Sequence, residues 1–307
     1  MNKLLVICGP TATGKTGLGI RLAKEFEGEI ISADSRQVYR GMDIGTGKDH
    51  PKGIKIHLID VVRPDEEFSV AHYYRLAWRE IKNLWRKGKL PILVGGTGFY
   101  IRAVVDGVGT KDIPRNLEVR ARIMDWSPEN LFNHLTKFDS ERAALMNQSD
   151  RNNPRRLVRA IEVAIFRKEN PSWQPPRHRK PEALFIGLRT ADEILDRRIE
   201  ARVKGRLEEG LEDEIKTLLN QGYTWESSAL NDTLAYKEWR SFFEGEETRE
   251  EVIDHWQTDE SQYAQRQMTW FKKDKRINWF DISQKRWQDR VVKLVKEWLA
   301  KKDAQKD

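Results

Sequence analysis

The sequence has a single cysteine, Cys8, among its 307 residues, and this cysteine falls inside an apolar run. A disulfide framework and a site made of several thiolates are therefore excluded, and a reducing compartment is expected. No apolar stretch approaches the roughly 18 residues of a membrane span, and no apolar signal core follows Met1. We expect a cytoplasmic protein that has no membrane segment.

A large excess of one charge is also lacking. The chain carries 55 lysine and arginine residues against 48 aspartate and glutamate residues, a net charge of +7, with an isoelectric point near 9.3. This modest excess is compatible with a polyanionic partner, but a basic soluble protein of another kind would share it. Eleven tryptophans are many for this length. Most lie beside charges in helix-like segments, where we interpret them as packing residues.

The most specific motif lies near the start of the chain. An apolar run at 4–8 predicts a strand, and an amphipathic segment at 18–26 predicts a helix. Between them stand a glycine, four residues and Gly-Lys-Thr, a pattern whose backbone N–H groups hold phosphate oxygens at a helix N-terminus. The lysine adds positive charge and the threonine hydroxyl can reach Mg²⁺. The residues predicted to hold the phosphates are Gly9, Pro10, Thr11, Ala12, Thr13, Gly14, Lys15 and Thr16, of which Thr16 is the expected metal ligand.

Polar residues follow other predicted strands. Asp34 comes directly after a short apolar run, and Thr97 follows another such run and two glycines. Ligands of open α/β sheets bind at the carboxyl ends of the strands, so both are candidate site residues. A carboxylate there can act as a base, although it can also serve only in a turn. A strand expected at 55–60 ends in Asp60, a further candidate for holding Mg²⁺.

Strand and helix signals alternate over the first third of the chain, which predicts a parallel, doubly wound sheet. From Pro114 the pattern changes to helix after helix, and a strand signal returns at 183–188. We therefore expect an α/β fold, a P-loop NTPase-like parallel sheet flanked by helices, with a mainly helical insertion. The expected boundaries are 1–112 for the first part of the core, 113–180 for the insertion, and 181–307 for the return to the core and the C-terminal helices.

Arginines occur in rows at helical spacing. Arg155, Arg156 and Arg159 fall on nearly one side of a predicted helix. Such a row can be a solvated face or a clamp for phosphates. A second row, in the helix expected to start at Asp192, steps by about one turn and can line a site for anions; it contains Arg197, Arg198, Arg202 and Arg206.

Together these motifs resemble the tRNA dimethylallyltransferase family, prenyltransferases that modify an adenosine beside the anticodon. Only the first motif is specific by itself, but all of them occur in the family's order. The matching segments are GPTATGKT at 9–16, SADSRQVYR at 32–40, DIGTGK at 43–48, HLIDVVRPDEEFSV at 57–70, GGTGFYI at 95–101, NNPRRLVRAIEV at 152–163 and RRIEARV at 197–203.

The resemblance implies a reaction and a role for each residue. It implies that a dimethylallyl group moves from dimethylallyl diphosphate, held by the phosphate loop with Mg²⁺, to the N6 amine of the adenosine. It further implies that Asp34 is the general base and that Thr97 and Arg202 are catalytic residues at the diphosphate. We expect a monomer. The residues implied to contact the tRNA anticodon stem-loop are Asp34, Ser35, Arg36, Gln37, Thr97, Arg120, Arg155, Arg156, Leu157, Val158 and Arg159.

The sequence departs from the family near its end. Relatives usually carry basic residues in the stretch that corresponds to 258–267, where this chain has Asp259, Glu260, Ser261 and Gln265. The departure concerns tRNA binding more than the chemistry, because the phosphate loop and Asp34 are intact.

Three other functions stay open from the sequence. An adenylate isopentenyltransferase would use the same loop and base on a free nucleotide, and a P-loop kinase would bind ATP in the loop. A non-catalytic RNA-binding protein would retain the fold without the reaction. The helical insertion and its basic rows favour tRNA as the partner.

Overall fold

The computed structural model describes residues 2–301, and the chain divides into two compact units. The first unit comprises Met1–Gly107 and Lys180–Asp307, and the second comprises Val108–Arg179. The end of the last expected segment, 302–307, lies outside the described residues. Each unit has a hydrophobic core of its own.

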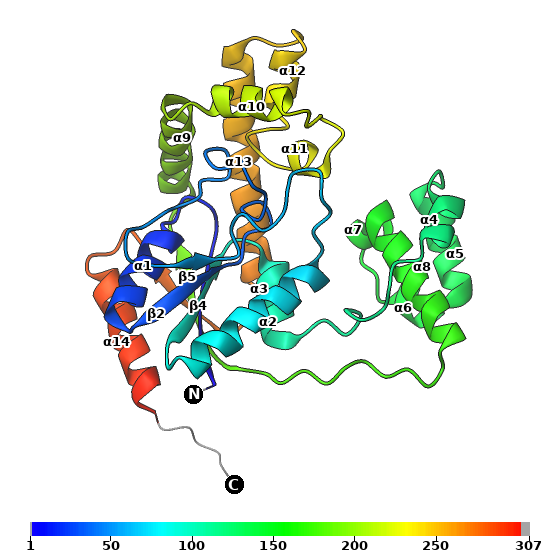
Figure 1. The fold of residues 1–307 in the computed structure, drawn as a ribbon, viewed down its shortest axis with the longest axis horizontal. Coiled ribbons are helices and arrows are strands. Elements are labelled where there is room, and N and C mark those ends of the chain that lie inside the picture. The colour runs from blue at the N-terminus through cyan, green and yellow to red at the C-terminus, as the bar shows by residue number, and fades with distance from the viewer. Residues whose placement is uncertain (1, 302–307) are drawn as a thin grey trace. The chain divides into compact units, whose positions relative to one another are not determined.

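The first unit is built on a six-stranded sheet whose strand pairs are all parallel (Figure 1). β1 lies between β4 and β5 and pairs with both. The expected α/β fold with a parallel sheet is confirmed. The strand order is β3-β2-β4-β1-β5-β6, with the bounds β1 Lys3–Cys8, β2 Gly28–Ser32, β3 Ile56–His57, β4 Leu90–Gly95, β5 Glu182–Arg189 and β6 Ile277–Asp281.

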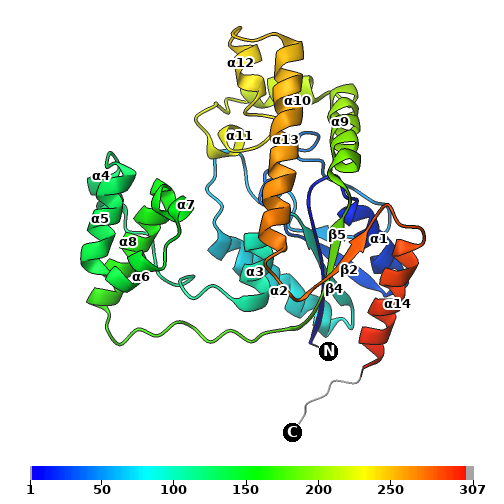
Figure 2. The same ribbon diagram turned by 180° about the vertical axis from the view of Figure 1, so that it is seen from behind.

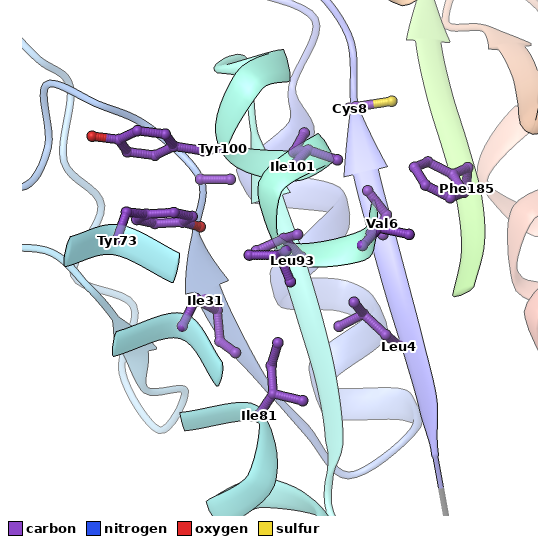
Figure 3. Packing of buried hydrophobic residues seen from close by; sticks show 14 of the residues in the cluster. Leu4, Val6, Cys8, Ile31, Tyr73, Ile81, Leu93, Tyr100, Ile101 and Phe185 are labelled. Carbon is purple, nitrogen blue, oxygen red and sulfur yellow. The ribbon is translucent and has the colours of Figure 1, made fainter. Parts of the chain in front are cut away.

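Helices cover both faces of this sheet, which is why its central strands are continuous apolar runs. Alternate side chains of β1 point to opposite faces, so Leu4 and Val6 enter one core cluster while Leu5 and Ile7 enter another. Figure 3 shows the first cluster, where Tyr73 packs near β2 and β4. The covering helices are α2 (Val70–Arg86) and α3 (Gly98–Asp106) on that face, and α1 (Lys15–Glu25) and α14 (Trp287–Ala300) on the other.

Five further helices of the first unit pack around a core of their own. Trp239 and Trp256 are fully buried there, as the packing interpretation of the tryptophans predicts. The longest helix, α13, runs beside α9 in both views (Figures 1 and 2). The five are α9 (Asp192–Glu208), α10 (Leu211–Asn220), α11 (Ser228–Asn231), α12 (Trp239–Phe243) and α13 (Arg249–Phe271).

The second unit is helical. Leu131, Leu135, Leu157 and Ile161 lie in its core. Across residues 2–301, no helix is long and apolar enough to cross a membrane. The helices of this unit are α4 (Leu117–Ile123), α5 (Pro128–Phe138), α6 (Ser140–Ala144), α7 (Gln148–Arg151) and α8 (Pro154–Glu169).

The strand expected at 55–60 is wrong in its extent. Only Ile56–His57 pairs with β2, because the chain then turns through positive φ angles at Leu58 (65°) and Asp60 (55°). The Asp60 carboxylate accepts a hydrogen bond from Nζ of the buried Lys48 at 2.5 Å. This partly exposed carboxylate is therefore engaged in an ion pair with Lys48, and its role as a Mg²⁺ ligand stays a prediction.

Candidate active site

The phosphate loop between β1 and α1 has the backbone that its sequence requires. Gly9 has a φ of +137°, and a Cβ atom there would lie only 2.4 Å from the Leu188 carbonyl oxygen of β5. Gly14 has a φ of +84° and is the N-cap of α1. Both positions favour glycine, since other residues rarely adopt such angles. The loop therefore leads directly into the N-terminus of α1, where backbone N–H groups and the helix dipole favour an anion.

The polar side chains of the loop fold back over it. Thr13 Oγ1 donates a hydrogen bond to the Pro10 carbonyl oxygen at 2.8 Å, and Lys15 Nζ donates to the same oxygen at 2.6 Å. Lys15 lies among other cations, and burial followed by the nearby Arg202 lowers its pKa to about 8. The Lys15 ammonium is thus held at the loop at a free-energy cost, which an arriving anion would offset.

Arginines of α9 reach the phosphate loop from a distant part of the sequence. Arg198 Nε donates to the Ala12 carbonyl oxygen at 2.6 Å, and the Arg202 guanidinium donates to the Thr11 hydroxyl. These arginines are four residues apart and therefore share one face of the helix. The row seen in the sequence is thus split: Arg198 and Arg202 bind the loop, whereas Arg197 bonds to Glu193 of its own helix.

Asp34 and Thr97 lie at the ends of two paired strands, β2 and β4. Asp34 Oδ1 accepts a hydrogen bond from the Arg36 backbone N–H at 2.8 Å, and Thr97 Oγ1 accepts one from the Ser35 N–H at 3.0 Å. A Cβ atom at Gly95 would lie 2.2 Å from the Ala33 carbonyl oxygen, so the two strand ends are in close contact. The turn interpretation of Asp34 is thus correct for one carboxylate oxygen, which the turn fixes in place.

Charge interactions connect Asp34 with the phosphate loop. The Asp34 carboxylate favours the protonated form of Lys15, opposing the fall of that lysine's pKa. It also disfavours ionisation of Tyr263, whose pKa burial and then Asp34 raise to about 12. Interactions between charges weaken with distance. The Asp34 carboxylate and the Lys15 ammonium therefore lie near each other at the carboxyl edge of the sheet.

One helix that sequence reasoning did not place at the site joins its parts. Gln267 of α13 accepts a hydrogen bond from the Thr11 N–H at 2.8 Å and donates to the Gly96 carbonyl oxygen at 3.0 Å. A single buried amide thus bridges the loop after β1 and the loop after β4. The helical spacing of Tyr263, Gln267 and Trp270 predicts that they share one face of a helix, but it does not indicate which loops this face contacts.

A family model described as IPP transferase matches residues 37–274. The chain belongs to the IPP transferase family. A curated tRNA dimethylallyltransferase from Acetivibrio thermocellus is 40% identical over 98% of this chain and 98% of its own length. One from Halothermothrix orenii is also 40% identical, over 97% of this chain and 94% of its own length.

Solved structures give the same result. The full-length tRNA isopentenylpyrophosphate transferase from Bacillus halodurans is 36% identical, with a TM-score of 0.72 over 98% of this chain and 96% of that chain. A eukaryotic dimethylallyltransferase acting on tRNA is 28% identical, with a TM-score of 0.83 over 99% of this chain and 81% of that chain. The resemblance to the family that the sequence motifs indicated is confirmed.

The residues of this IPP transferase chain that were expected to contact tRNA fall in both units. Ser35, Arg36 and Gln37 lie beside Asp34 in the first unit. Ser35 is held by Thr97, while the Gln37 side chain donates to the Gly47 carbonyl oxygen at 3.0 Å. These residues thus shape the edge of the site.

In the second unit, the arginines expected to contact tRNA differ in their exposure and in their partners. Arg155 and Arg156 are exposed at the start of α8. Arg120 and Arg159 instead bind the carboxylate of Glu162, which is fully buried, at 2.7 and 3.1 Å. An unpaired buried carboxylate is costly, so these two arginines support the fold of the unit.

Two apolar members of the same expected group differ in exposure. Leu157 is fully buried in the core of the second unit, so neither its side chain nor its backbone is accessible to tRNA in this structure. Its helical spacing with Ala160 and Ile161 already places it on the apolar face. Val158 is partly buried against the same core.

The unusual residues at 259–261 of this IPP transferase chain have internal partners. Asp259 accepts a hydrogen bond from Lys237 Nζ at 2.7 Å, and Ser261 donates one to Asp196 at 2.9 Å. Glu260 is buried and pairs with Arg206 of α9 at 3.1 Å. These three residues therefore hold α13 against α9 and the segment before α12.

Proposed function

We propose that this chain transfers a dimethylallyl group from dimethylallyl diphosphate to the N6 amine of an adenosine beside the anticodon of tRNA, releasing diphosphate. The observation that carries the proposal is that the Asp34 carboxylate follows β2 and the cationic phosphate loop follows β1, at the carboxyl edge of one parallel sheet. The relatives' names, tRNA dimethylallyltransferase, support the same reaction. We place this reaction in the cytoplasm.

The donor's diphosphate would lie in the phosphate loop. The N–H groups at the start of α1 and the charges of Lys15, Arg198 and Arg202 all favour an anion there. As the allylic carbon–oxygen bond breaks, the electron pair and the negative charge go to the diphosphate. Fixed cations stabilise this departing charge more than they stabilise the bound donor, which lowers the barrier.

Mg²⁺ is part of the proposal. Thr16 stands at the second position of α1 and offers one hydroxyl oxygen. This donor fits Mg²⁺, which prefers oxygen ligands, retains several waters and takes its remaining ligands from substrate phosphates. When bound, the ion would neutralise part of the diphosphate charge.

Asp34 would act on the acceptor. The exocyclic amine of adenine is a poor nucleophile, so a carboxylate that accepts its hydrogen bond and then its proton assists formation of the carbon–nitrogen bond. One Asp34 oxygen is fixed by the Arg36 N–H, which orients the carboxylate towards the site without using both oxygens. The target base has to leave its stack to reach this carboxylate.

Donor binding should weaken as the pH rises through about 8, the pKa of Lys15 in the protein without ligand. Below this pH the ammonium attracts the diphosphate; above it the neutral amine does not. The donor's own last ionisation lies near pH 6, as for other phosphate esters, so its charge does not change over this range.

Titration calorimetry with dimethylallyl diphosphate at a series of pH values measures the effect. The Lys15→Arg variant retains its charge and should lose this dependence; equal slopes for both proteins would contradict the assignment to Lys15.

The exposed pair Arg155 and Arg156 is proposed to contact tRNA phosphates. Replacing both by alanine should weaken binding of every tRNA. The slope of log K against log salt concentration should become shallower by about 2, which corresponds to two lost phosphate contacts. Filter-binding or fluorescence titrations between low and moderate salt measure this slope. The control variant Arg286→Ala/Arg290→Ala removes the same charge from the start of α14 and should leave the slope unchanged. A slope equal to that of the unmodified protein would refute the phosphate contacts.

The experiment that tests the function offers both possible donors and both possible acceptors. The protein is incubated with Mg²⁺, either dimethylallyl diphosphate or ATP, and either bulk tRNA or AMP, and the products are identified by mass spectrometry. A dimethylallyl adduct on an adenosine of tRNA is the expected product. An adduct on AMP would indicate an adenylate isopentenyltransferase, and phosphoryl transfer from ATP a kinase; either result without tRNA modification would overturn the proposal.

A further inference from the structure

Behind the phosphate loop lies an ion pair that no step above requires. Arg206 Nη1 of α9 donates to Glu260 Oε1 of α13 at 3.1 Å, and the two residues are each 5% exposed. The Arg206 Nε atom is buried without a hydrogen-bond partner among the described residues. Burial, and then the charge of Arg202, lower the pKa of Arg206 to about 10.

This pair is poorly explained as a stabilising contact. Removing two charges from water costs several kcal/mol per ion, and apolar residues in the same place are often equally stable or more so. The unpartnered Nε adds a further cost. The pair therefore has little value for stability alone, and the groups beside it indicate another role.

The Arg206 guanidinium lies next to that of Arg202. A Cβ atom built on Gly47 would lie 2.8 Å from Arg206 Nη2 and 2.9 Å from Arg202 Nη2, so both guanidinium groups approach the same point of the backbone. Arg206 is bound to Glu260 of α13, while Arg202 donates to the Thr11 hydroxyl of the phosphate loop. The buried Arg206 guanidinium therefore occupies space directly beside that of Arg202.

The charges around the pair act in the same direction. The like charge of Arg206 repels Arg202, which is bonded to Thr11 of the phosphate loop. Glu260 also interacts electrostatically with Lys15. Without Arg206, its carboxylate would be an unpaired buried anion close to a site for anions, and Arg206 neutralises it.

We propose that Arg206, with Glu260 as its counter-ion, is a positioning residue that holds the Arg202 guanidinium against the phosphate loop and thereby sets the affinity for the diphosphate. The inference rests on the function proposed above, since it assigns the diphosphate to this loop. Arg206 itself, being buried, acts through Arg202.

The decisive variant is Arg206→Met/Glu260→Met, which removes one positive and one negative charge and so leaves the net charge of the site unchanged. The single variant Arg206→Met would leave Glu260 unpaired in the interior, which is strongly destabilising. The double variant avoids this problem and should melt close to the temperature of the unmodified protein. The matched control is Arg249→Met/Glu212→Met, which removes a more exposed pair that joins α13 to α10 at 2.7 Å.

Titration calorimetry with inorganic pyrophosphate and Mg²⁺ is the first measurement. We expect the double variant to bind pyrophosphate about tenfold more weakly, the scale expected when a binding group is displaced by a fraction of an ångström, and the control to bind it normally. In steady-state assays the KM for dimethylallyl diphosphate should rise while the KM for tRNA stays constant.

Each outcome separates the inference from the function beneath it. If the unmodified protein fails to bind pyrophosphate, the proposed function itself is wrong. If it binds, and the folded double variant binds equally well, Arg206 and Glu260 are only part of the helix packing and the inference is overturned. A rise in the KM for tRNA alone would overturn it as well.

Discussion

The Asp34→Asn variant should lose prenyl transfer almost completely, by about 10²- to 10⁴-fold in kcat, the range typical of a lost general base. The substitution is nearly isosteric. The amide oxygen can still accept the Arg36 N–H that the carboxylate accepts at 2.8 Å, so the turn after β2 should be retained. What the amide cannot do is take a proton from the adenine amine.

Single-turnover assays with saturating tRNA and dimethylallyl diphosphate measure the chemical step directly. Binding of tRNA and of pyrophosphate should stay close to that of the unmodified protein, because the loops that hold Asp34 are unchanged. The Ser35→Ala variant serves as the control. It removes a neighbouring hydroxyl group but retains the backbone N–H of residue 35, which donates to Thr97 Oγ1. Turnover by Asp34→Asn at a normal rate would rule out Asp34 as the base.

The Lys15→Met variant should lose donor binding and turnover by about 10²-fold or more, the usual effect of removing one group that stabilises a developing charge. Methionine retains the length and apolar stem of lysine but has no charge to offer the diphosphate. It also lacks the hydrogen bond that Lys15 Nζ donates to the Pro10 carbonyl oxygen.

The Lys15→Met variant should be at least as stable to unfolding as the unmodified protein, although it binds the donor more weakly. The pKa of Lys15 falls to about 8 in the folded protein. Below pH 8 the buried amine is therefore charged, and burying this charge lowers the free energy of unfolding. Methionine removes this cost, and the melting temperature at pH 7 should be equal or higher. Thermal melts paired with donor titrations check both effects. A variant that melts lower and binds normally would show that Lys15 serves structure rather than the ligand.

The parts of the site that depend on local sequence could be predicted. The phosphate loop could be located because its glycines, lysine and threonine stand at fixed spacing between a strand and a helix. Asp34 and Thr97 could be selected because each follows a strand, and parallel strands present their carboxyl ends at one edge. The structure brings all three features to that edge.

Contacts between distant segments could not be predicted. No local pattern reveals that Gln267 bonds to Thr11, or that Arg206 faces Glu260, because these pairings depend on how α9 and α13 pack. The arginines of the second unit show the same limit. The sequence predicts that Arg155 and Arg159 lie on one face of a helix. Only the structure shows that Arg159 is bonded to the buried Glu162 and, at 2.8 Å, to the Ile113 carbonyl oxygen.

The hydrogen bond between the Thr11 N–H and the Gln267 amide oxygen has a consequence for synthesis, because 256 positions separate the two residues. As the chain leaves the ribosome, the glycine-rich turn at Thr11 emerges 256 residues before its partner Gln267. A product cut short before α13 would lack the residue that ties the two loops together. Nascent chains should therefore not sequester the prenyl donor until α13 has emerged and Gln267 has reached Thr11.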